Sequence, residues 1–143
     1  MSEGGKHSVS VAGVVVDDRD RALVVQRRDN GRWEAPGGVL EPGEDIVSGL
    51  LREVREETGL DVAPVALTGV YKNMTLGVVA LVFRCTKIGG TLTESDETQA
   101  FRWVTEHEAA KIADEAFAVR VTDALNPRQP VPVRHHDGTD LTD

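Results

Sequence analysis

The residues of this sequence that most directly suggest chemistry are three glutamates, Glu53, Glu56 and Glu57. They stand at positions i, i+3 and i+4, so on a helix their carboxylates share one face within a single turn. Like charges at this spacing repel and destabilise a helix by about 0.2–0.5 kcal/mol per pair. A divalent cation would compensate the repulsion, because Mg²⁺ is held by a few carboxylates together with substrate phosphates. The alternative is an ordinary solvated face, which is what glutamate-rich helices usually present.

The residues around this acidic cluster add to the case for a metal site. Gly37 and Gly38 precede the predicted helix through a loop, where glycine lets the backbone approach a ligand closely. Glu44 stands near the start of the helix, where the helix dipole favours a carboxylate. Arg52 adjoins the glutamates in the sequence. From these features alone, both the metal site and the solvated face remain open.

The helix that must carry the cluster is predicted over residues 44–58. Its apolar residues recur at three- and four-residue steps, which is helical spacing: Ile46, Val47, Leu50, Leu51 and Val54. Gly59 follows where a C-terminal cap would stand.

Short β-branched and apolar runs predict strands on both sides of this helix. The predicted strands cover residues 8–16, 22–27, 62–71, 75–85 and 100–104. The first two are separated by a charged turn and suggest a hairpin. Gly89 and Gly90 predict a turn before a short strand at residues 91–93. A capping-box pattern from Thr105 to Glu108 opens a second helix to about residue 123, with a break near Asp114.

Strands and helices that are interspersed without strict alternation predict an α/β sandwich around a mixed β-sheet. The sequence has no internal repeat and no linker, so residues 1–143 are expected to form a single domain. Residues 126–143 hold three of the six prolines and are predicted to be an extended tail. We expect this tail to pack on its own domain or against a neighbouring subunit of a homodimer.

Composition excludes several classes of protein. The net charge of −8 argues against a general nucleic-acid binder, which needs a surplus of Lys and Arg. An acidic site can still hold a phosphorylated small molecule when divalent cations lie between carboxylates and phosphates. The longest apolar runs are too short to span a membrane. The polar residues 1–6 lead into no signal-peptide core, and Cys85 is the single cysteine, so we expect a cytoplasmic protein without disulfides.

The segment from Gly38 to Leu60 fills every defined position of the pattern G-x5-E-x7-R-E-U-x-E-E-x-G-U, where U is aliphatic. This pattern is the Nudix box, and the surrounding strands extend the resemblance over roughly residues 9–113. The chain therefore resembles the MutT-like Nudix hydrolases. The resemblance implies a Nudix-type α/β/α sandwich around a mixed β-sheet.

The resemblance also implies a reaction. Nudix hydrolases use Mg²⁺ or Mn²⁺ to hydrolyse a phosphoanhydride in a nucleoside diphosphate linked to another moiety, by in-line attack of water on phosphorus. The positions that match the family's metal ligands are Gly38, Glu53, Glu56, Glu57 and Glu97. Arg52 and Glu44 match the pair that orients the ligating glutamates.

Three roles are less closely defined. The additional loop carboxylate is expected at Glu97, with Glu94 and Asp96 as alternatives, and the general base is either Glu53 or Glu97. Substrate contacts are expected from three residues, namely Arg27, Gly37 and Tyr71.

The substrate class rests on absent signatures. Thr75 stands where ADP-ribose pyrophosphatases typically carry a proline, and residues 76–78 lack the tyrosine of many dinucleoside-polyphosphate hydrolases. The default substrate is therefore a (deoxy)nucleoside triphosphate or related nucleotide, a small molecule, with no membrane and no general nucleic-acid partner. Alternatives are an ADP-ribose, nucleotide-sugar or dinucleoside-polyphosphate hydrolase, or a catalytically silent nucleotide-binding or regulatory module.

Aromatic and histidine residues supply no further marker. Trp33 and Trp103 are expected to be packing residues. His135 and His136 are adjacent on an extended segment, so their side chains should point in opposite directions rather than share a metal ion.

Overall fold

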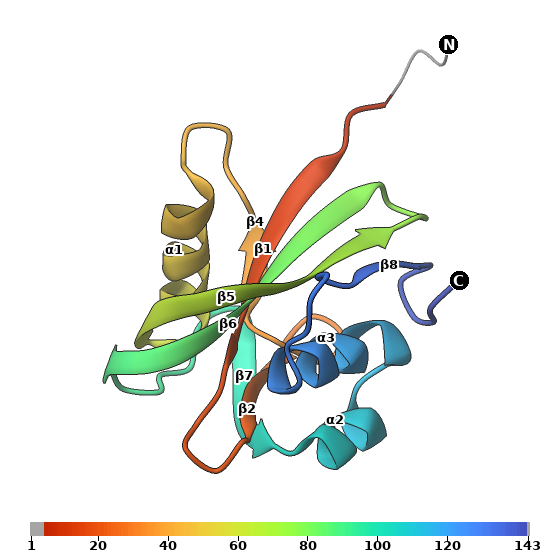
Figure 1. Cartoon of the computed structure of the whole chain (residues 1–143). Coiled ribbons are helices and arrows are strands. Elements are labelled where there is room, and N and C mark those ends of the chain that lie inside the picture. Colours follow the sequence, from red (N-terminus) through yellow and green to blue (C-terminus); the bar gives the residue numbers. More distant parts are fainter. Residues whose placement is uncertain (1–4, 143) are drawn as a thin grey trace.

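The computed structural model describes residues 5–142, and its helices and strands are shown in Figure 1. Residues 1–4 of the polar N-terminus and residue 143 of the tail lie outside the described residues. In chain order the elements are β1 (Ser8–Val15), β2 (Ala22–Arg27), β3 (Trp33–Glu34), β4 (Gly37–Val39), α1 (Ile46–Thr58), β5 (Leu60–Asn73), β6 (Val78–Gly90), β7 (Thr98–Val104), α2 (Glu106–Ile112), α3 (Glu115–Leu125) and β8 (Val133–His136).

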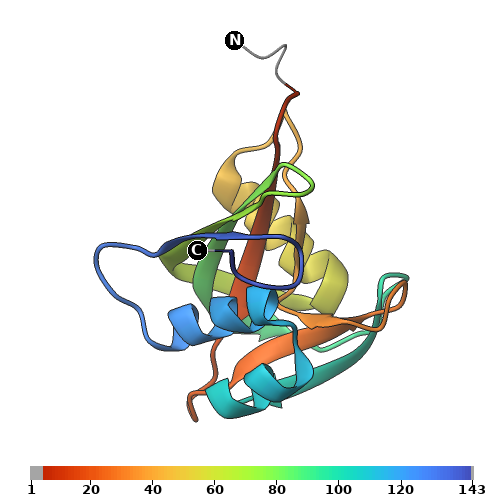
Figure 2. The same cartoon turned by 90° about the vertical axis from the view of Figure 1, so that its right-hand side faces the viewer.

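The strands form two sheets. The larger has the order β4-β1-β6-β5-β8, and it is mixed because β1 pairs with β6 and β5 pairs with β8 in parallel, while the other pairs are antiparallel. The smaller sheet is antiparallel in the order β3-β2-β7. Helix α1 lies on one side of the larger sheet, and α3 lies on the other beside α2 (Figures 1 and 2). The predicted α/β/α sandwich around a mixed sheet is confirmed.

Strand β1 shows why the core has two halves. Its side chains alternate, so that Val11 and Val15 pack in the cluster with α1 while Ala12 and Val14 pack in the cluster with α3. Both faces of β1 are buried, as expected for a strand covered by helices on both sides. A Cβ at Gly13 would lie 2.9 Å from a methyl of the α1 residue Val54, so this glycine allows close packing.

The helix that carries the acidic cluster begins two residues later than predicted. Asp45 is its N-cap, and its carboxylate accepts a hydrogen bond of 2.8 Å from the backbone N–H of Ser48. Glu44 therefore precedes the helix rather than forming its first turn. Gly59 ends the helix with a φ of 80°, which confirms the predicted cap.

Two local predictions are wrong. Strands β1 and β2 belong to different sheets and meet only at the Val16–Ala22 bridge, so they form no hairpin. Both edges of β1 are taken by β4 and β6, which leaves none for β2. Gly89 and Gly90 form no turn but end β6 in register with the start of β5, and residues 91–93 are not a strand.

The second predicted helix is two helices. Thr105 and Glu108 form the predicted capping box of α2, and the chain breaks at Ala113 and Asp114 before α3 begins. No helix among residues 5–142 is long and apolar enough to cross a membrane.

The tail packs on its own domain. Strand β8 adds to the edge of β5, with Val133 opposite Val70 and His136 opposite Asn73. The guanidinium of Arg134 donates two hydrogen bonds of 2.8 Å to Asp123 of α3, which fastens the strand to the helix.

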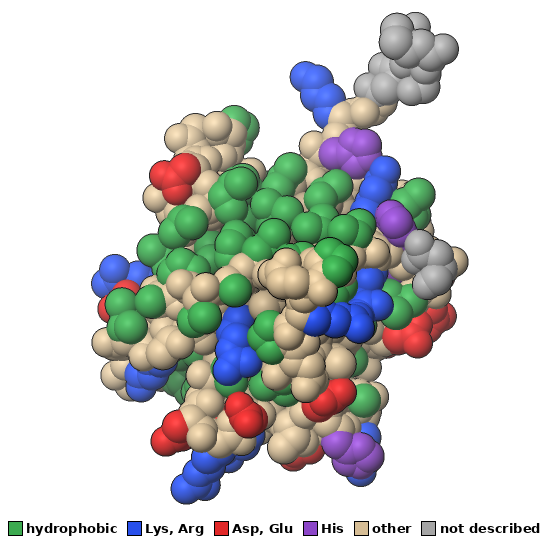
Figure 3. Space-filling view, in the orientation of Figure 1, with side chains coloured by type: hydrophobic (Ala, Val, Ile, Leu, Met, Phe, Trp, Pro, Cys, Tyr) green, Lys and Arg blue, Asp and Glu red, His purple; other side chains and the backbone are tan. Residues whose placement is uncertain are grey.

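One face of the molecule is rich in apolar side chains, which gather over β5 and β6 in the upper half of Figure 3. Exposed apolar residues of this part of the chain include Val65, Met74 and Leu76. The homodimer stays a prediction.

Candidate functional site

Helix α1 presents the acidic cluster to strand β4. Glu53 and Glu57 point inward and are only 8% and 6% exposed, whereas the side chain of Glu56 is 60% exposed. The spacing of i and i+4 puts the two inward carboxylates on the same face of the helix. The three glutamates therefore share a turn, as predicted, but differ strongly in burial.

The glycines of β4 lie directly against these carboxylates. The backbone N–H of Gly37 donates a hydrogen bond of 3.0 Å to Glu57 Oε1. A Cβ at Gly38 would collide with the carboxylate of Glu53, and one at Gly37 would collide with the β1 backbone. Glycine is required here because strand and carboxylates approach more closely than any side chain allows.

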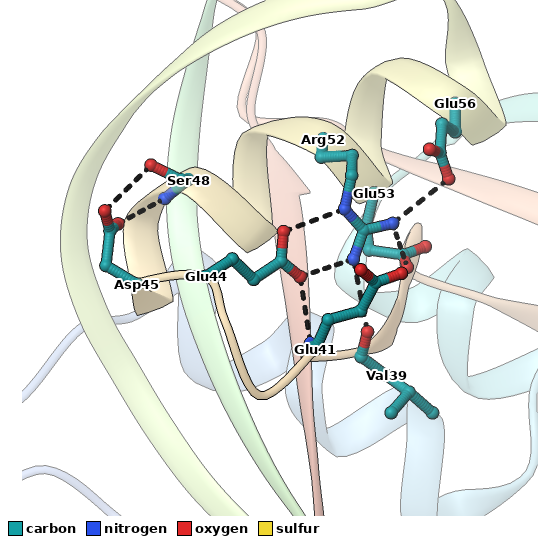
Figure 4. Close-up of polar contacts among 8 residues, drawn as sticks. All are labelled: Val39, Glu41, Glu44, Asp45, Ser48, Arg52, Glu53 and Glu56. Carbon is teal, nitrogen blue, oxygen red and sulfur yellow. Dashed lines mark hydrogen bonds and ion pairs between the residues drawn. The ribbon is translucent and has the colours of Figure 1, made fainter.

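Arg52 joins the loop to the cluster, as Figure 4 shows. Its guanidinium donates from Nε to Glu44 at 2.9 Å, and from Nη1 to Glu53 at 2.9 Å and to Glu56 at 3.2 Å. Glu44 in turn accepts a hydrogen bond of 3.0 Å from the backbone N–H of Glu41. The hydrogen bonds from Arg52, followed by that from Glu41, lower the pKa of Glu44 to about 2. The structure thus places Arg52 and Glu44 where they hold Glu53 and Glu56.

The inward carboxylates are electrostatically unfavourable. Burial first, and then the nearby charges of Glu34, Glu53 and Glu97, raise the pKa of Glu57 to about 8 in spite of the hydrogen bond from Gly37. Burial also raises the pKa of Glu53. A buried carboxylate without a cation is costly, so this arrangement calls for a positive charge between the helix and β4.

A hard divalent cation fits this donor set. The available atoms are carboxylate oxygens of the acidic cluster and the backbone carbonyl of Gly38, which are the oxygen ligands that Mg²⁺ and Mn²⁺ prefer. Within residues 5–142, no three His, Cys, Asp or Glu side chains already stand in the geometry of a bound metal ion. In this arrangement Arg52 supplies the positive charge between Glu53 and Glu56.

The loop before β7 brings a further carboxylate close to the cluster. Glu97 is exposed, and its charge raises the pKa of both Glu53 and Glu57. A backbone hydrogen bond of 2.9 Å from Arg28 to Glu97 ties the loop to the end of β2. Glu94, the alternative, pairs with the side chain of Arg28 at 3.4 Å. The structure therefore places Glu97 near the cluster.

A cavity of about 270 Å³ opens beside β4, and we call it the β4 cavity. Gly37 and Gly38 line one end of it. Arg27 also lines the cavity, but its guanidinium is paired with Asp29 at 2.7 Å and with Glu34 at 3.1 Å. Arg27 therefore borders the cavity with its charge already compensated, and its contact with substrate stays a prediction.

Tyr71 does not lie in a position from which it could contact a substrate. Its side chain is fully buried, and its hydroxyl donates a hydrogen bond of 2.6 Å to Asp123. The ring lies beneath the guanidinium of Arg120, 5.0 Å from the ring centroid. The expected substrate contact is thus wrong, because β5 turns this side chain into the core toward α3.

Three further residues of the β4 cavity were missed from the sequence: Phe117, Arg120 and His136. The alternation at His135 and His136 indicated that one ring faces inward, but the sequence does not show which cavity β8 borders. Trp33 and Trp103 pack against the two core clusters, as expected.

Comparison with known proteins identifies relatives of the whole domain. The model of the NUDIX domain matches residues 6–125. A MutT-like protein of Streptomyces ambofaciens is 53% identical over 94% of this chain and 87% of its own length. A human 8-oxo-dGDP phosphatase is 39% identical over 89% of this chain, which spans only 35% of that protein. Among solved structures, a NUDIX hydrolase from Nitrosomonas europaea superposes with a TM-score of 0.79 at 21% identity, covering 94% of this chain and 82% of that one.

Proposed function

Because this chain belongs to the Nudix hydrolase family, we propose that it uses Mg²⁺ or Mn²⁺ to hydrolyse a phosphoanhydride bond in a (deoxy)nucleoside triphosphate or related nucleotide. The observation that carries the proposal is the pair of buried carboxylates, Glu53 and Glu57, held against the glycine backbone of β4. Carboxylates in such a place need a cation, and a metal-bound diphosphate would share it.

The residues that would hold the metal are Glu53, Glu56, Glu57 and the carbonyl of Gly38, with Glu97 from the facing loop. When bound, the cation would neutralise the diphosphate, stabilise charge in the transition state and lower the pKa of a water molecule.

The other residues of the site position the reacting groups. Arg52 and Glu44 orient Glu53 and Glu56, so their removal should loosen the site without deleting a ligand. Either Glu53 or Glu97 would accept the proton of the attacking water as it approaches phosphorus in line. Burial raises the pKa of Glu53, and a higher pKa makes a carboxylate a stronger proton acceptor.

The β4 cavity supports a single nucleotide as substrate. It begins at Gly37 and Gly38, beside the proposed metal site, and its volume of about 270 Å³ is near the small end of ligand pockets. Phosphates at the glycine end would leave the nucleoside in the cavity. We also place the protein in the cytoplasm, since its single cysteine is buried and unpaired.

The proposal is tested by a hydrolysis panel with Mg²⁺ and Mn²⁺. The panel comprises nucleoside triphosphates, oxidised dGTP, ADP-ribose, nucleotide sugars and dinucleoside polyphosphates, with phosphate and pyrophosphate measured separately to locate the attacked phosphorus. We expect turnover of a triphosphate or related nucleotide that EDTA abolishes and Mg²⁺ restores. Glu57→Gln should remove it, whereas Glu106→Gln, an exposed glutamate of α2, should not. Turnover in EDTA, or in Glu57→Gln, would contradict the metal mechanism, and no turnover of any substrate would indicate a silent binding module.

A further inference from the structure

On the α3 side, the β4 cavity is bordered by Arg120, a partly buried arginine that forms no ion pair within residues 5–142. Its guanidinium carbon lies 4.8 Å from the ring centroid of Phe117 and 5.0 Å from that of Tyr71. Its Nε atom is inaccessible to solvent and has no hydrogen-bond partner among the described residues. Glu34, whose charge reaches Arg120, already accepts a hydrogen bond from Arg27. An unpaired buried charge is costly, so a ligand that supplies an acceptor would relieve it.

His136 of β8 lies beside this arginine and is also a donor. The backbone N–H of Gly138 donates a hydrogen bond of 3.0 Å to His136 Nδ1. A neutral imidazole that accepts at Nδ1 carries its hydrogen on Nε2. Burial and the charge of Arg120 lower the pKa of His136, which favours the neutral ring.

The two donors face each other across a short gap. His136 Nε2 lies 3.4 Å from Arg120 Nη2, and a guanidinium has no acceptor. With Nε2 protonated, this contact joins two N–H groups and is not a hydrogen bond. Both groups line the β4 cavity, where a single acceptor atom of a ligand could receive a hydrogen bond from each.

The rest of the cavity indicates which ligand carries that acceptor. Val78 and Ala80 of β6, which lies between β4 and β8 in the larger sheet, add apolar walls, and the ring of Phe117 lies against both donors. A ligand with an anionic end at the glycines, a flat apolar body and an oxygen at the far end matches this order. A nucleotide whose base bears an exocyclic carbonyl has these three parts.

We propose that Arg120 and His136 recognise the base of the substrate by donating hydrogen bonds to its exocyclic carbonyl oxygen. The pair would select bases with a carbonyl where adenine and cytosine carry an amino group, because an amino group presents a donor to two donors. This inference rests on the proposed function, since it requires a nucleotide with its phosphates at the glycine end.

The expected discrimination follows from two hydrogen bonds, one of them from a charged group. Leaving such buried donors unpaired costs about tenfold to a hundredfold in affinity. The matched ligands are inosine and adenosine monophosphates, which differ at position 6 of the purine, and uridine and cytidine monophosphates, which differ at position 4 of the pyrimidine.

The experiment is isothermal titration calorimetry of the full chain in Mg²⁺, which separates base recognition from catalysis because a nucleoside monophosphate contains no phosphoanhydride bond. The wild type should bind the carbonyl member of each pair at least about tenfold more tightly than the amino member. In Arg120→Met and in His136→Ala the ratio should fall to within about threefold. The matched control is Arg102→Met, which also removes an arginine lying over an aromatic ring, that of Trp33 at 6.0 Å, but outside the cavity. It should keep the wild-type ratio.

Three results would overturn the inference. One is equal affinity of the wild type for the two members of each pair, and a failure to bind either member counts as the same result. Another is a wild-type ratio that persists in both variants. The third is a loss of affinity in Arg120→Met that is as large for ribose 5-phosphate or pyrophosphate as for inosine monophosphate. The two donors would then bind a phosphate and not the base.

Folding of each variant is checked by urea unfolding, and if Arg120→Met does not fold, His136→Ala and the wild-type ratios decide. The outcome is separable from that of the proposed function. If the protein discriminates between bases but hydrolyses no nucleotide, the proposed function fails and this inference holds. If it hydrolyses nucleotides without discriminating between bases, this inference fails and the proposed function holds.

Discussion

The buried carboxylate of Glu57 should make the metal-free protein less stable as the pH rises. Its pKa in the folded protein is about 8, against an ordinary value of 4.5. The folded state therefore holds this proton more tightly than the unfolded state does. The resulting stability is fully present below pH 4.5 and is lost as the pH rises through about 8.

The size of the effect follows from the gap between the two pKa values. At about 1.36 kcal/mol for each pH unit, the gap corresponds to about 5 kcal/mol as an upper limit. Local opening admits water to the carboxylate and reduces this cost, so we expect a loss of about 2–3 kcal/mol between about pH 5 and about pH 8. Glu57→Gln resembles the protonated acid and should escape this loss.

The assay is urea unfolding in EDTA at the two pH values, with the free energy of unfolding compared between wild type and Glu57→Gln. The two proteins should be similar near pH 5, and the variant should be more stable by about 2–3 kcal/mol near pH 8. His136 changes stability in the opposite sense, because burial lowers its pKa, but it is common to both proteins and cancels. Glu106→Gln, which removes an exposed glutamate, should follow the wild type.

Addition of Mg²⁺ near pH 8 should stabilise the wild type and leave Glu57→Gln nearly unchanged, because the cation replaces the proton on the carboxylate. The reasoning would be refuted if Glu57→Gln were less stable than the wild type near pH 8 without metal. A wild type and variant with the same dependence on pH would refute it equally.

Four further substitutions test the site and the ion pair that fastens β8 to α3. Glu44→Gln should weaken Mg²⁺ binding, measured by calorimetry, by about 10–100-fold. Arg52→Gln in the same protein should weaken it little further, because the two residues act as a pair. Effects of the two substitutions that add in full in the double variant would argue against the pair. Gly38→Ala should abolish hydrolysis in a folded protein, because its Cβ would displace the carboxylate of Glu53; normal turnover would contradict the close approach. Asp123→Asn should cost about 3–5 kcal/mol in urea unfolding, since it breaks a buried ion pair, and a cost below about 1 kcal/mol would show that the pair is not needed.

The helical turn that carries the acidic cluster could be predicted almost completely from local sequence. The spacing of Glu53, Glu56 and Glu57 is a property of any helix, and the helix itself follows from its apolar periodicity and from Gly59 at its end. The glycines before it could be predicted to approach a ligand, since no other residue type permits it. These predictions needed only neighbours within a few residues along the chain.

Strand pairing could not be predicted in the same way, because it depends on which edges other strands have taken. Strand β2 follows β1 in the sequence and looks like its hairpin partner, yet β4 and β6 occupy both edges of β1. Likewise Gly89 and Gly90 look like a turn, but both pair with the first residues of β5, so the β-ladder continues through them. Non-local pairing overrode the local turn signal in both places.

The base-facing end of the β4 cavity was decided by tertiary structure alone. Arg120 and His136 come from a helix and a tail strand that contribute nothing to the motif at residues 38–60, and Tyr71 lies below them in the core instead of in the site. The docking of β8 on β5, fastened to α3 by Arg134 and Asp123, brings His136 beside Arg120 in the β4 cavity. The sequence by itself therefore predicted the family and the carboxylates of the proposed metal site, because these lie on one helical turn. The substrate pocket depended on the tertiary fold, because its walls come from segments distant along the chain.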